Sequence, residues 1–205
     1  DVTNSEQLEH WRAFLQELVA RGVRGVKLVT SDAHRGLKQA IREVFIGAGW
    51  QRCRVHFLRN LLVHVPKAAQ AMVGATVRPI FNQSSRAQAQ AQLKQVCSAL
   101  RGRFPKVTAM LEEAEEEILA FYDFPREHWR QIYSTNPLER LNKELKRRSA
   151  VVGIFPNRAA VVRLLGALLA EQNDEWLVQK HYFSEASMRK LTERAVEHSL
   201  ELASA

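Results

Sequence analysis

The sequence predicts an α/β chain with predominantly helical content, in which a small α/β piece precedes a long helical stretch and a helical return. Two short apolar runs, 26–30 and 50–57, have the β-branched or alternating character of strands. Amphipathic helices precede and separate them, and such an order at short spacing is typical of parallel pairing. Residues 66–130 contain no convincing strand pattern, so the remainder of the fold is expected to be helical.

The first expected element is a helix over residues 5–21. Its apolar side chains recur at helical spacing, at Leu8, Trp11, Leu15 and Leu18. Ser5 suits the N-terminal cap, and Gly22 and Gly25 end the helix.

A strand over 26–30 and a helix over 35–47 follow, joined by the stretch SDAHRGL. Asp32 therefore stands just past the carboxyl end of a predicted parallel strand, where open α/β sheets bind their ligands. A carboxylate there suits binding or catalysis. Ser31 or Asp32 can instead cap the next helix. The residues alone leave both roles open.

The second strand, 50–57, continues into a helix and carries the motif C-x-x-H at Cys53 and His56. Thiolate and imidazole can bind zinc, but a structural zinc site needs four ligands, and no second pair stands at useful spacing. In a strand the two side chains would point to opposite faces, unless the strand ends between them. The simplest interpretation of Cys53 is a small buried core residue.

The stretch 66–130 is expected to form roughly four helices, punctuated by prolines. Its acidic run LEEAEEEILAFY is typical of a solvated helix face. After Arg148, SAVVGIFPN is expected to be a loop, and two further helices follow at about 157–179 and 184–202.

The stretch STNPLERLNKELKRR, Ser134–Arg148, begins with a helix-start signal and ends in basic residues. Asn136 suits the cap and Pro137 the first helical position. Glu139 is then in the third position, from which its side chain can reach back to the N–H of the cap. Capping is thus a complete structural explanation of Glu139.

The rest of this helix also suits a phosphodiester. At helical spacing Leu138, Leu141 and Leu145 form an apolar stripe, flanked by Glu139, Asn142 and Lys146 and by further basic residues. Cations can hold a DNA backbone and a carboxylate can hold a metal ion. Asp32 and Glu139 are the two candidate acids, although a two-ion site normally needs more carboxylates.

Charge and composition restrict the setting. The chain has 30 Lys and Arg against 22 Asp and Glu, a net charge of +8, which favours a polyanionic partner such as DNA, RNA or an anionic membrane surface. No apolar run approaches the roughly 20 residues of a membrane span. Two cysteines are too few for a disulfide scaffold. We therefore expect a cytoplasmic protein that does not enter a membrane.

Three stretches, VKLVTSDAHRGLKQAI, WQRCRVHFLRN and YSTNPLERLNKELKRR, resemble in this order the second half of bacterial insertion-sequence transposases of the Mutator superfamily. The resemblance runs from about residue 20 to about residue 180. It implies a ribonuclease-H-like core with an Asp-Asp-Glu triad, in which Asp32 is the second Asp and Glu139 the Glu. Cys53, His56 and Asn136 match motif positions of unclear role.

The resemblance further implies metal-dependent DNA cleavage and strand transfer at transposon ends. Asp32 and Glu139 would be catalytic and would bind Mg²⁺ or Mn²⁺, with the two-ion site expected in the full-length enzyme. The residues expected to bind DNA are Asn142, Lys143, Lys146, Arg147 and Arg148. The expected partners are transposon-end and target DNA and, in the full-length enzyme, further copies of the same chain.

One departure concerns the first Asp of the triad, which belongs on an earlier strand. Asp1 is the only acid before Ser5, and no strand pattern surrounds it. We therefore expect a C-terminal portion that lacks the first strands of the core and is inactive alone. The expected segments are 1–64, the second part of the core with Asp32 and the C-x-x-H strand; 65–132, an all-α insertion; and 133–205, the return with the Glu139 helix.

Two other functions fit the same residues. One is a non-catalytic basic helical module that binds nucleic acid or a protein. The other is a metal-dependent nuclease of the same fold, which would share the two acids.

Overall fold

The structure is a computed structural model that describes residues 7–178 and 183–191. The chain divides into two compact units: the first ends at Thr135 and the second begins at Asn136. In the described part of the chain, no helix is long and apolar enough to cross a membrane.

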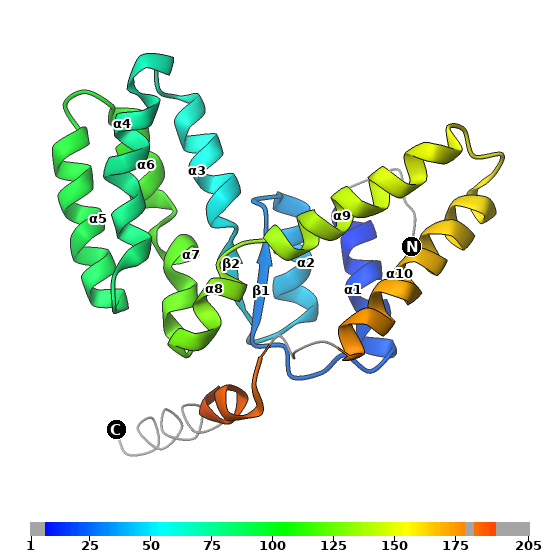
Figure 1. The fold of residues 1–205 in the computed structure, drawn as a ribbon. Helices are drawn as coiled ribbons and strands as arrows, with labels where there is room; N and C mark the ends of the chain where they lie inside the picture. Colours follow the sequence, from blue (N-terminus) through cyan, green and yellow to red (C-terminus); the bar gives the residue numbers. More distant parts are fainter. Residues whose placement is uncertain (1–6, 179–182, 192–205) are drawn as a thin grey trace. The chain divides into compact units, whose positions relative to one another are not determined.

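The first unit opens with the expected α/β piece (Figure 1). Its elements are α1 (Leu8–Ala20), β1 (Leu28–Ser31), α2 (Arg35–Val44), β2 (Gly49–Arg52) and α3 (Arg54–Val63). The two strands pair in parallel, with Leu28 opposite Gly49 and Ser31 opposite Arg52. The prediction of parallel pairing in a mostly helical α/β chain is confirmed. Ser5, the predicted cap of the first helix, lies outside the described residues.

The second strand is shorter than predicted. It ends at Arg52, and Cys53 stands at the N-terminus of α3, so His56 lies in a helix and not in a strand. Phe57 and Leu61, four residues apart, are both fully buried in the core of the helical segment. This helical spacing of buried side chains outweighs the alternation that suggested a strand as far as residue 57.

A helical segment, from α4 to α8, completes the first unit. It comprises α4 (Lys67–Val77), η1 (Arg78–Asn82), α5 (Arg86–Leu100), α6 (Pro105–Glu113), α7 (Glu115–Leu119), η2 (Ala120–Asp123), η3 (Arg126–His128) and α8 (Trp129–Ile132). The expected helices of 66–130 are thus present, and this stretch contains no strand. In Figure 1, α4, α5 and α6 lie side by side.

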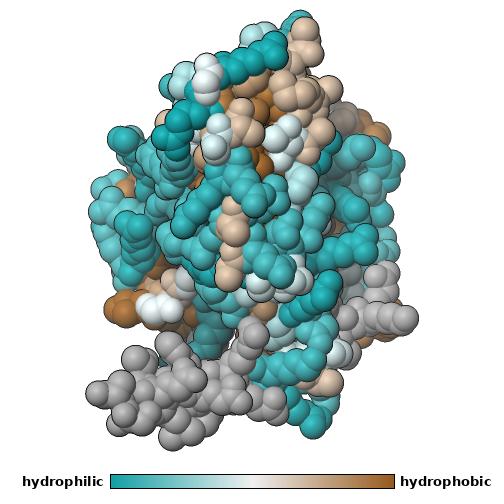
Figure 2. All heavy atoms as spheres, turned by 90° about the vertical axis from the view of Figure 1, so that its left-hand side faces the viewer, coloured by the Kyte–Doolittle hydropathy of each residue, from teal (hydrophilic) through white to brown (hydrophobic). Residues whose placement is uncertain are grey.

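Two hydrophobic clusters hold the first unit together. The smaller consists of Leu15, Ala40 and Ile41, between α1 and α2. The larger runs from α3 through the helical segment and includes Val73, Ile80, Leu93, Leu111, Ile118 and Phe121. The face of the helical segment that Figure 2 turns to the viewer is mostly hydrophilic, as expected of helices that bury one side.

The second unit contains α9 (Asn136–Ser149), the short turn η4 (Ala150–Val152) and α10 (Arg158–Val178). Helix α9 begins at Asn136, one residue earlier than predicted. The side chain of Asn157 accepts a hydrogen bond from the N–H of Ala160 at 2.9 Å and so caps α10. Residues 185–191 are helical, and the rest of the helix predicted over 184–202 lies outside the described residues.

Candidate functional site

Parallel pairing brings two of the predicted site residues to one edge of the sheet, called here the strand edge: the carboxyl ends of β1 and β2 with Asp32 and Cys53. The N–H of Cys53 donates to the carbonyl of Ser31 at 2.7 Å, so the strands stay in register up to this edge. Because both strands end here, side chains from separate parts of the chain converge, as they do at ligand sites of other parallel sheets.

Asp32 presents a half-exposed carboxylate at the strand edge, with 54% of its side chain accessible. One carboxylate oxygen accepts a hydrogen bond from the N–H of Ala33 at 2.8 Å. The other lies 4.0 Å from Nδ1 of His56. The histidine of the C-x-x-H motif, His56, therefore lies beside Asp32, the predicted catalytic acid.

The capping interpretation of Asp32 is wrong. His34 occupies the N-cap of α2, and its Nδ1 accepts a hydrogen bond from the N–H of Leu37 at 3.3 Å. Ser31 is occupied elsewhere, because its hydroxyl donates to the carbonyl of Asp32 and accepts from the indole N–H of Trp50. Asp32 is thus not needed to begin α2.

Cys53 is fully buried at the strand edge and holds the chain as it returns from the helical segment. Its sulfur accepts hydrogen bonds from the N–H of Thr135 at 3.4 Å and from the hydroxyl of Thr135 at 3.3 Å. The interpretation of Cys53 as a buried residue is confirmed, and its polar contact gives it a further role that the motif did not reveal.

Residues 132–135, called here the return segment, are fixed to the strand edge at two further points. The hydroxyl of Thr30 donates to the carbonyl of Ile132 at 2.6 Å. The N–H of Arg54 donates to the carbonyl of Tyr133 at 3.0 Å. Sequence reasoning missed Thr30 and Arg54, because their partners lie about 80 to 100 residues along the chain and no local pattern marks them.

The second unit carries the other predicted residues on one helix. Asn136 is the first residue of α9 and Glu139 lies in its first turn. Asn142, Lys143, Lys146 and Arg147 are exposed on the same helix.

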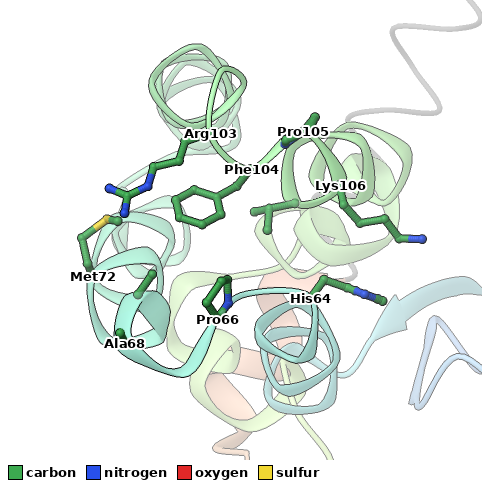
Figure 3. Close-up of a pocket in the computed structure, with 10 residues that line it drawn as sticks. His64, Pro66, Ala68, Met72, Arg103, Phe104, Pro105 and Lys106 are labelled. Carbon is green, nitrogen blue, oxygen red and sulfur yellow. The ribbon is translucent and has the colours of Figure 1, made fainter.

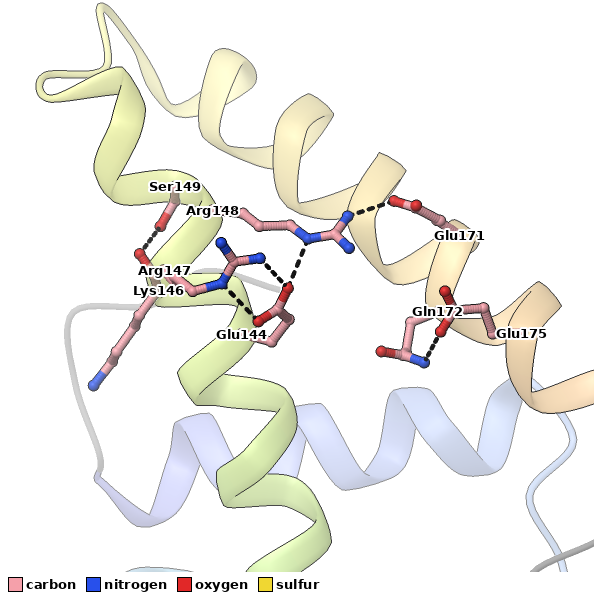
Figure 4. A network of polar contacts seen from close by, with 8 residues as sticks. All are labelled: Glu144, Lys146, Arg147, Arg148, Ser149, Glu171, Gln172 and Glu175. Carbon is pink, nitrogen blue, oxygen red and sulfur yellow. Dashed lines mark hydrogen bonds and ion pairs between the residues drawn. The ribbon is translucent and has the colours of Figure 1, made fainter. Parts of the chain in front are cut away.

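A carboxylate that sequence reasoning missed engages two of the predicted DNA-binding residues. The guanidinium of Arg147 donates to both oxygens of Glu144, at 2.9 and 2.7 Å. Arg148 donates to Glu144 at 2.8 Å and to Glu171 of α10 at 2.6 Å (Figure 4). Figure 4 also shows Lys146 pointing away from this network. The spacing of three and four residues between Glu144 and the arginines was the signal available in the sequence.

The hydrogen bonds of this network change the chemistry of Glu144. Those from Arg147, and then those from Arg148, lower the pKa of the Glu144 carboxyl from its ordinary 4.5 to about 2. Glu144 is therefore ionised at neutral pH and offsets part of the positive charge of α9.

A hollow of about 570 Å³ lies elsewhere in the first unit, between α4 and the start of α6. Figure 3 shows the ring of Phe104 in its middle, with Arg103 reaching toward Met72 and with His64 and Lys106 on the other side. None of the predicted site residues lines it. The predicted site residues of the first unit therefore lie at the strand edge and not at this hollow.

The fold and the site together define a class of protein: an α/β core with an acid and a C-x-x-H motif at one strand edge, a helical segment, and a basic helix after it. The family model described as "Transposase, Mutator family" matches residues 1–179. The chain belongs to the Mutator family of transposases.

Named relatives agree with this assignment. The chain is 48% identical to the transposase for insertion sequence element IS1081 of Mycobacterium tuberculosis, over 88% of this chain and 44% of that protein. It is 39% identical to the transposase for ISRM5 of Rhizobium meliloti, over 93% and 48%. It is 36% identical to the transposase for IS256 in transposon Tn4001 of Staphylococcus aureus, over 86% and 45%. The chain spans about half the length of these relatives.

Proposed function

We propose that this chain forms part of the catalytic core of an insertion-sequence transposase, which cleaves DNA at the ends of its element and joins them to a target. The observation that carries the proposal is the strand edge itself. Asp32 leaves β1 there, and the return segment that leads into the Glu139 helix is hydrogen-bonded to the same edge at three residues.

Asp32 and Glu139 are the proposed metal ligands. Carboxylate oxygens suit Mg²⁺ or Mn²⁺, and Asp32 is half-exposed with no part in capping α2. Four residues join Thr135 to Glu139, a length of chain of at most about 14 Å. When bound, two such ions activate the attacking oxygen and stabilise the leaving oxygen of a phosphodiester.

The proposed architecture is a ribonuclease-H-like core interrupted by the helical segment. The parallel pair of β1 and β2, with α2 between them in the chain, supports this assignment. The division into 1–64, 65–132 and 133–205 is part of the same proposal. The return segment, which comes back to the sheet after the helical segment, agrees with an insertion placed before the last acid.

The DNA partner is proposed from charge and exposure. Asn142, Lys143 and Lys146 are exposed on α9, where they can contact phosphates. Arg147 and Arg148 are engaged by Glu144, so we expect them to contribute less than their charge suggests. The complete transposase is proposed to act as an assembly of identical chains.

The test is the variant Glu139→Gln in the complete transposase. If Glu139 binds the metal, strand transfer between element-end and target DNA is lost, while DNA binding without metal stays close to wild type. Asp32→Asn gives the same result, because His34 and not Asp32 caps α2.

Glu144→Gln is the matched control, since it removes the other acid of α9 that holds two arginines. It retains strand transfer. If Glu139 only caps its helix, Glu139→Gln instead keeps activity, because a glutamine in this position can accept the same capping hydrogen bond. If the wild-type transposase cleaves element-end DNA without joining it to a target, the protein is a nuclease. If it binds DNA and catalyses neither reaction, it is a non-catalytic module.

A further inference from the structure

A second polar site lies in the first unit, beside the start of α3. It is a pocket of about 350 Å³, lined by Arg54, Val55, Leu58, Arg78, Phe81 and Asn82. Its polar side chains are two guanidinium groups and one amide, and none of its lining residues is acidic. All of these groups can donate hydrogen bonds.

Arg54 is held in this pocket by aromatic rings. Its guanidinium carbon lies 3.6 Å from the centroid of the Tyr133 ring and 5.5 Å from that of Phe81. A guanidinium stacked in this way loses little freedom when a ligand binds, because its planar fork is already oriented.

The charge of Arg54 is not balanced by an acid. Burial lowers the pKa of its guanidinium, and the side chains that oppose this shift are Tyr133, Tyr122 and Cys53. Phenols and thiols are mostly neutral at pH 7. In the part of the chain that the structure describes, Arg54 forms no ion pair with a carboxylate. A half-buried charge without a counterion is costly, so the pocket favours an anion.

Arg78, at the start of η1, brings a second positive charge to the same pocket, and it is exposed. Two like charges that line one pocket repel each other, and an anion between them removes this repulsion. Planar guanidinium forks fit the oxygens of a phosphate, and the amide of Asn82 supplies a further donor.

We propose that Arg54, Arg78 and Asn82 bind a backbone phosphate of DNA. Arg54 follows Cys53 directly, so the phosphate would lie next to the strand edge, on the face of the helical segment. This inference rests on the proposed function, since it names a contact of the same DNA. It gives the helical segment a part in holding the substrate, in addition to the cations of α9.

The experiment measures binding of a short fluorescein-labelled DNA duplex to the chain by anisotropy, in EDTA and over a series of salt concentrations. The test variant is Arg78→Gln, because Arg78 is exposed and does not contact Tyr133 as Arg54 does. The matched control is Arg59→Gln, which removes the same charge from an exposed position of α3 outside the pocket.

We expect Arg78→Gln to reduce the slope of log affinity against log salt by about 0.9, the loss of one phosphate contact on duplex DNA. The slope for Arg59→Gln stays at the wild-type value. The reduction is the same with two duplexes of unrelated sequence, because a phosphate contact reads no bases. A melting temperature equal to that of wild type shows that Arg78→Gln is folded.

Equal slopes for the two variants would overturn the proposed pocket. That outcome leaves the metal site untouched, because the assay contains no divalent ion. Conversely, retention of strand transfer by Glu139→Gln removes the metal proposal and leaves the slope difference in place. A wild-type chain that binds no DNA at all also overturns the proposed pocket and, in an assay without divalent ions, leaves the metal proposal to the strand-transfer test.

Discussion

Cys53, the first residue of the C-x-x-H motif, connects the strand edge to the return segment. A thiol is a weak hydrogen-bond acceptor, yet this one is fully buried and receives two hydrogen bonds from Thr135. His56, one turn later, has its Nδ1 4.0 Å from the Asp32 carboxylate, and one of its ring nitrogens lies within 4.8 Å of the Cys53 sulfur. The two halves of the C-x-x-H motif therefore lie beside each other, with the cysteine bound to the return segment and the histidine next to the acid.

Glu144 gives a prediction about acid stability. Its folded pKa is lowered, so the stability that its hydrogen bonds supply is fully present above the ordinary pKa of 4.5 and is lost as the pH falls through about 2. The melting temperature of the wild-type chain should therefore fall more steeply between these two pH values than that of Glu144→Gln. Thermal melts followed by circular dichroism at a series of pH values measure the difference.

Glu175→Gln is the control for this prediction, because Glu175 accepts a hydrogen bond from the neutral amide of Gln172 and not from an arginine. Its melting curve should follow the wild-type pH dependence. Added salt should reduce the effect at Glu144, since the pair is exposed and screened. A Glu144→Gln variant with the full wild-type pH dependence would contradict the argument.

At the scale of elements, Gln51 joins the sheet to the helical segment. It is fully buried in β2. Its amide N–H₂ donates to the carbonyl of Ile118 at 3.2 Å, and its carbonyl accepts from the N–H of Phe121 at 2.8 Å. One side chain thus satisfies two backbone groups at the junction of α7 and η2, which would otherwise be buried without partners.

Replacing this amide should be costly. Gln51→Leu introduces an apolar side chain of similar size and leaves the N–H of Phe121 and the carbonyl of Ile118 without the hydrogen bonds that Gln51 makes. At about 1–3 kcal/mol for each of these two buried unsatisfied groups, we expect a loss of roughly 2–6 kcal/mol in the free energy of unfolding. Urea denaturation measures it.

Gln70→Leu is the matched control for Gln51→Leu. Gln70 donates to the carbonyls of Leu62 and Val65, but it is only partly buried, so water can replace its hydrogen bonds. Its loss should be clearly smaller. Equal losses for the two variants would show that the junction at β2 does not depend on Gln51.

The elements also show what the sequence could and could not predict. The first strand, the parallel pair and the helices of 66–130 follow from local periodicity, and the structure has them, with the strand at Leu28–Ser31 instead of the predicted Val26–Thr30. The predicted end of the second strand was wrong. The strand stops at Arg52 because Phe57 and Leu61 are buried, as part of a helix, in a core built from distant segments. Asp32 and the C-x-x-H motif could be selected from the sequence, whereas Thr30, Arg54 and Gln51 could not, since their partners come from distant segments.

At the scale of the molecule, the buried apolar side chains are unevenly distributed. Both hydrophobic clusters lie wholly in the first unit, and the partly buried side chains that join them extend no further than Tyr133. Neither α9 nor α10 has a buried residue. Because burial of apolar surface is the main favourable term in folding, the first unit supplies most of the stabilisation that the described residues contribute.

This distribution predicts the behaviour of two fragments. Residues 1–135 alone should unfold cooperatively in urea, with a transition that fluorescence of Trp11, Trp50 and Trp129 can follow. Residues 136–205 alone should lose helicity gradually on heating, because α9 and α10 have no buried side chains and isolated helices are marginal in water. Circular dichroism measures the second fragment. A gradual transition for residues 1–135 would contradict the prediction.

The hydrogen bond between Arg54 and Tyr133 joins the two ends of the chain segment that contains the helical segment. The chain leaves the sheet at one of these residues, passes through the whole helical segment, and comes back to the other within 3.0 Å. When the two ends of a stretch meet in this way, extra residues in one of its exposed loops have little effect on the positions of the ends. We therefore expect an insertion into an exposed turn of the helical segment to leave the geometry of the acid-bearing strands unchanged.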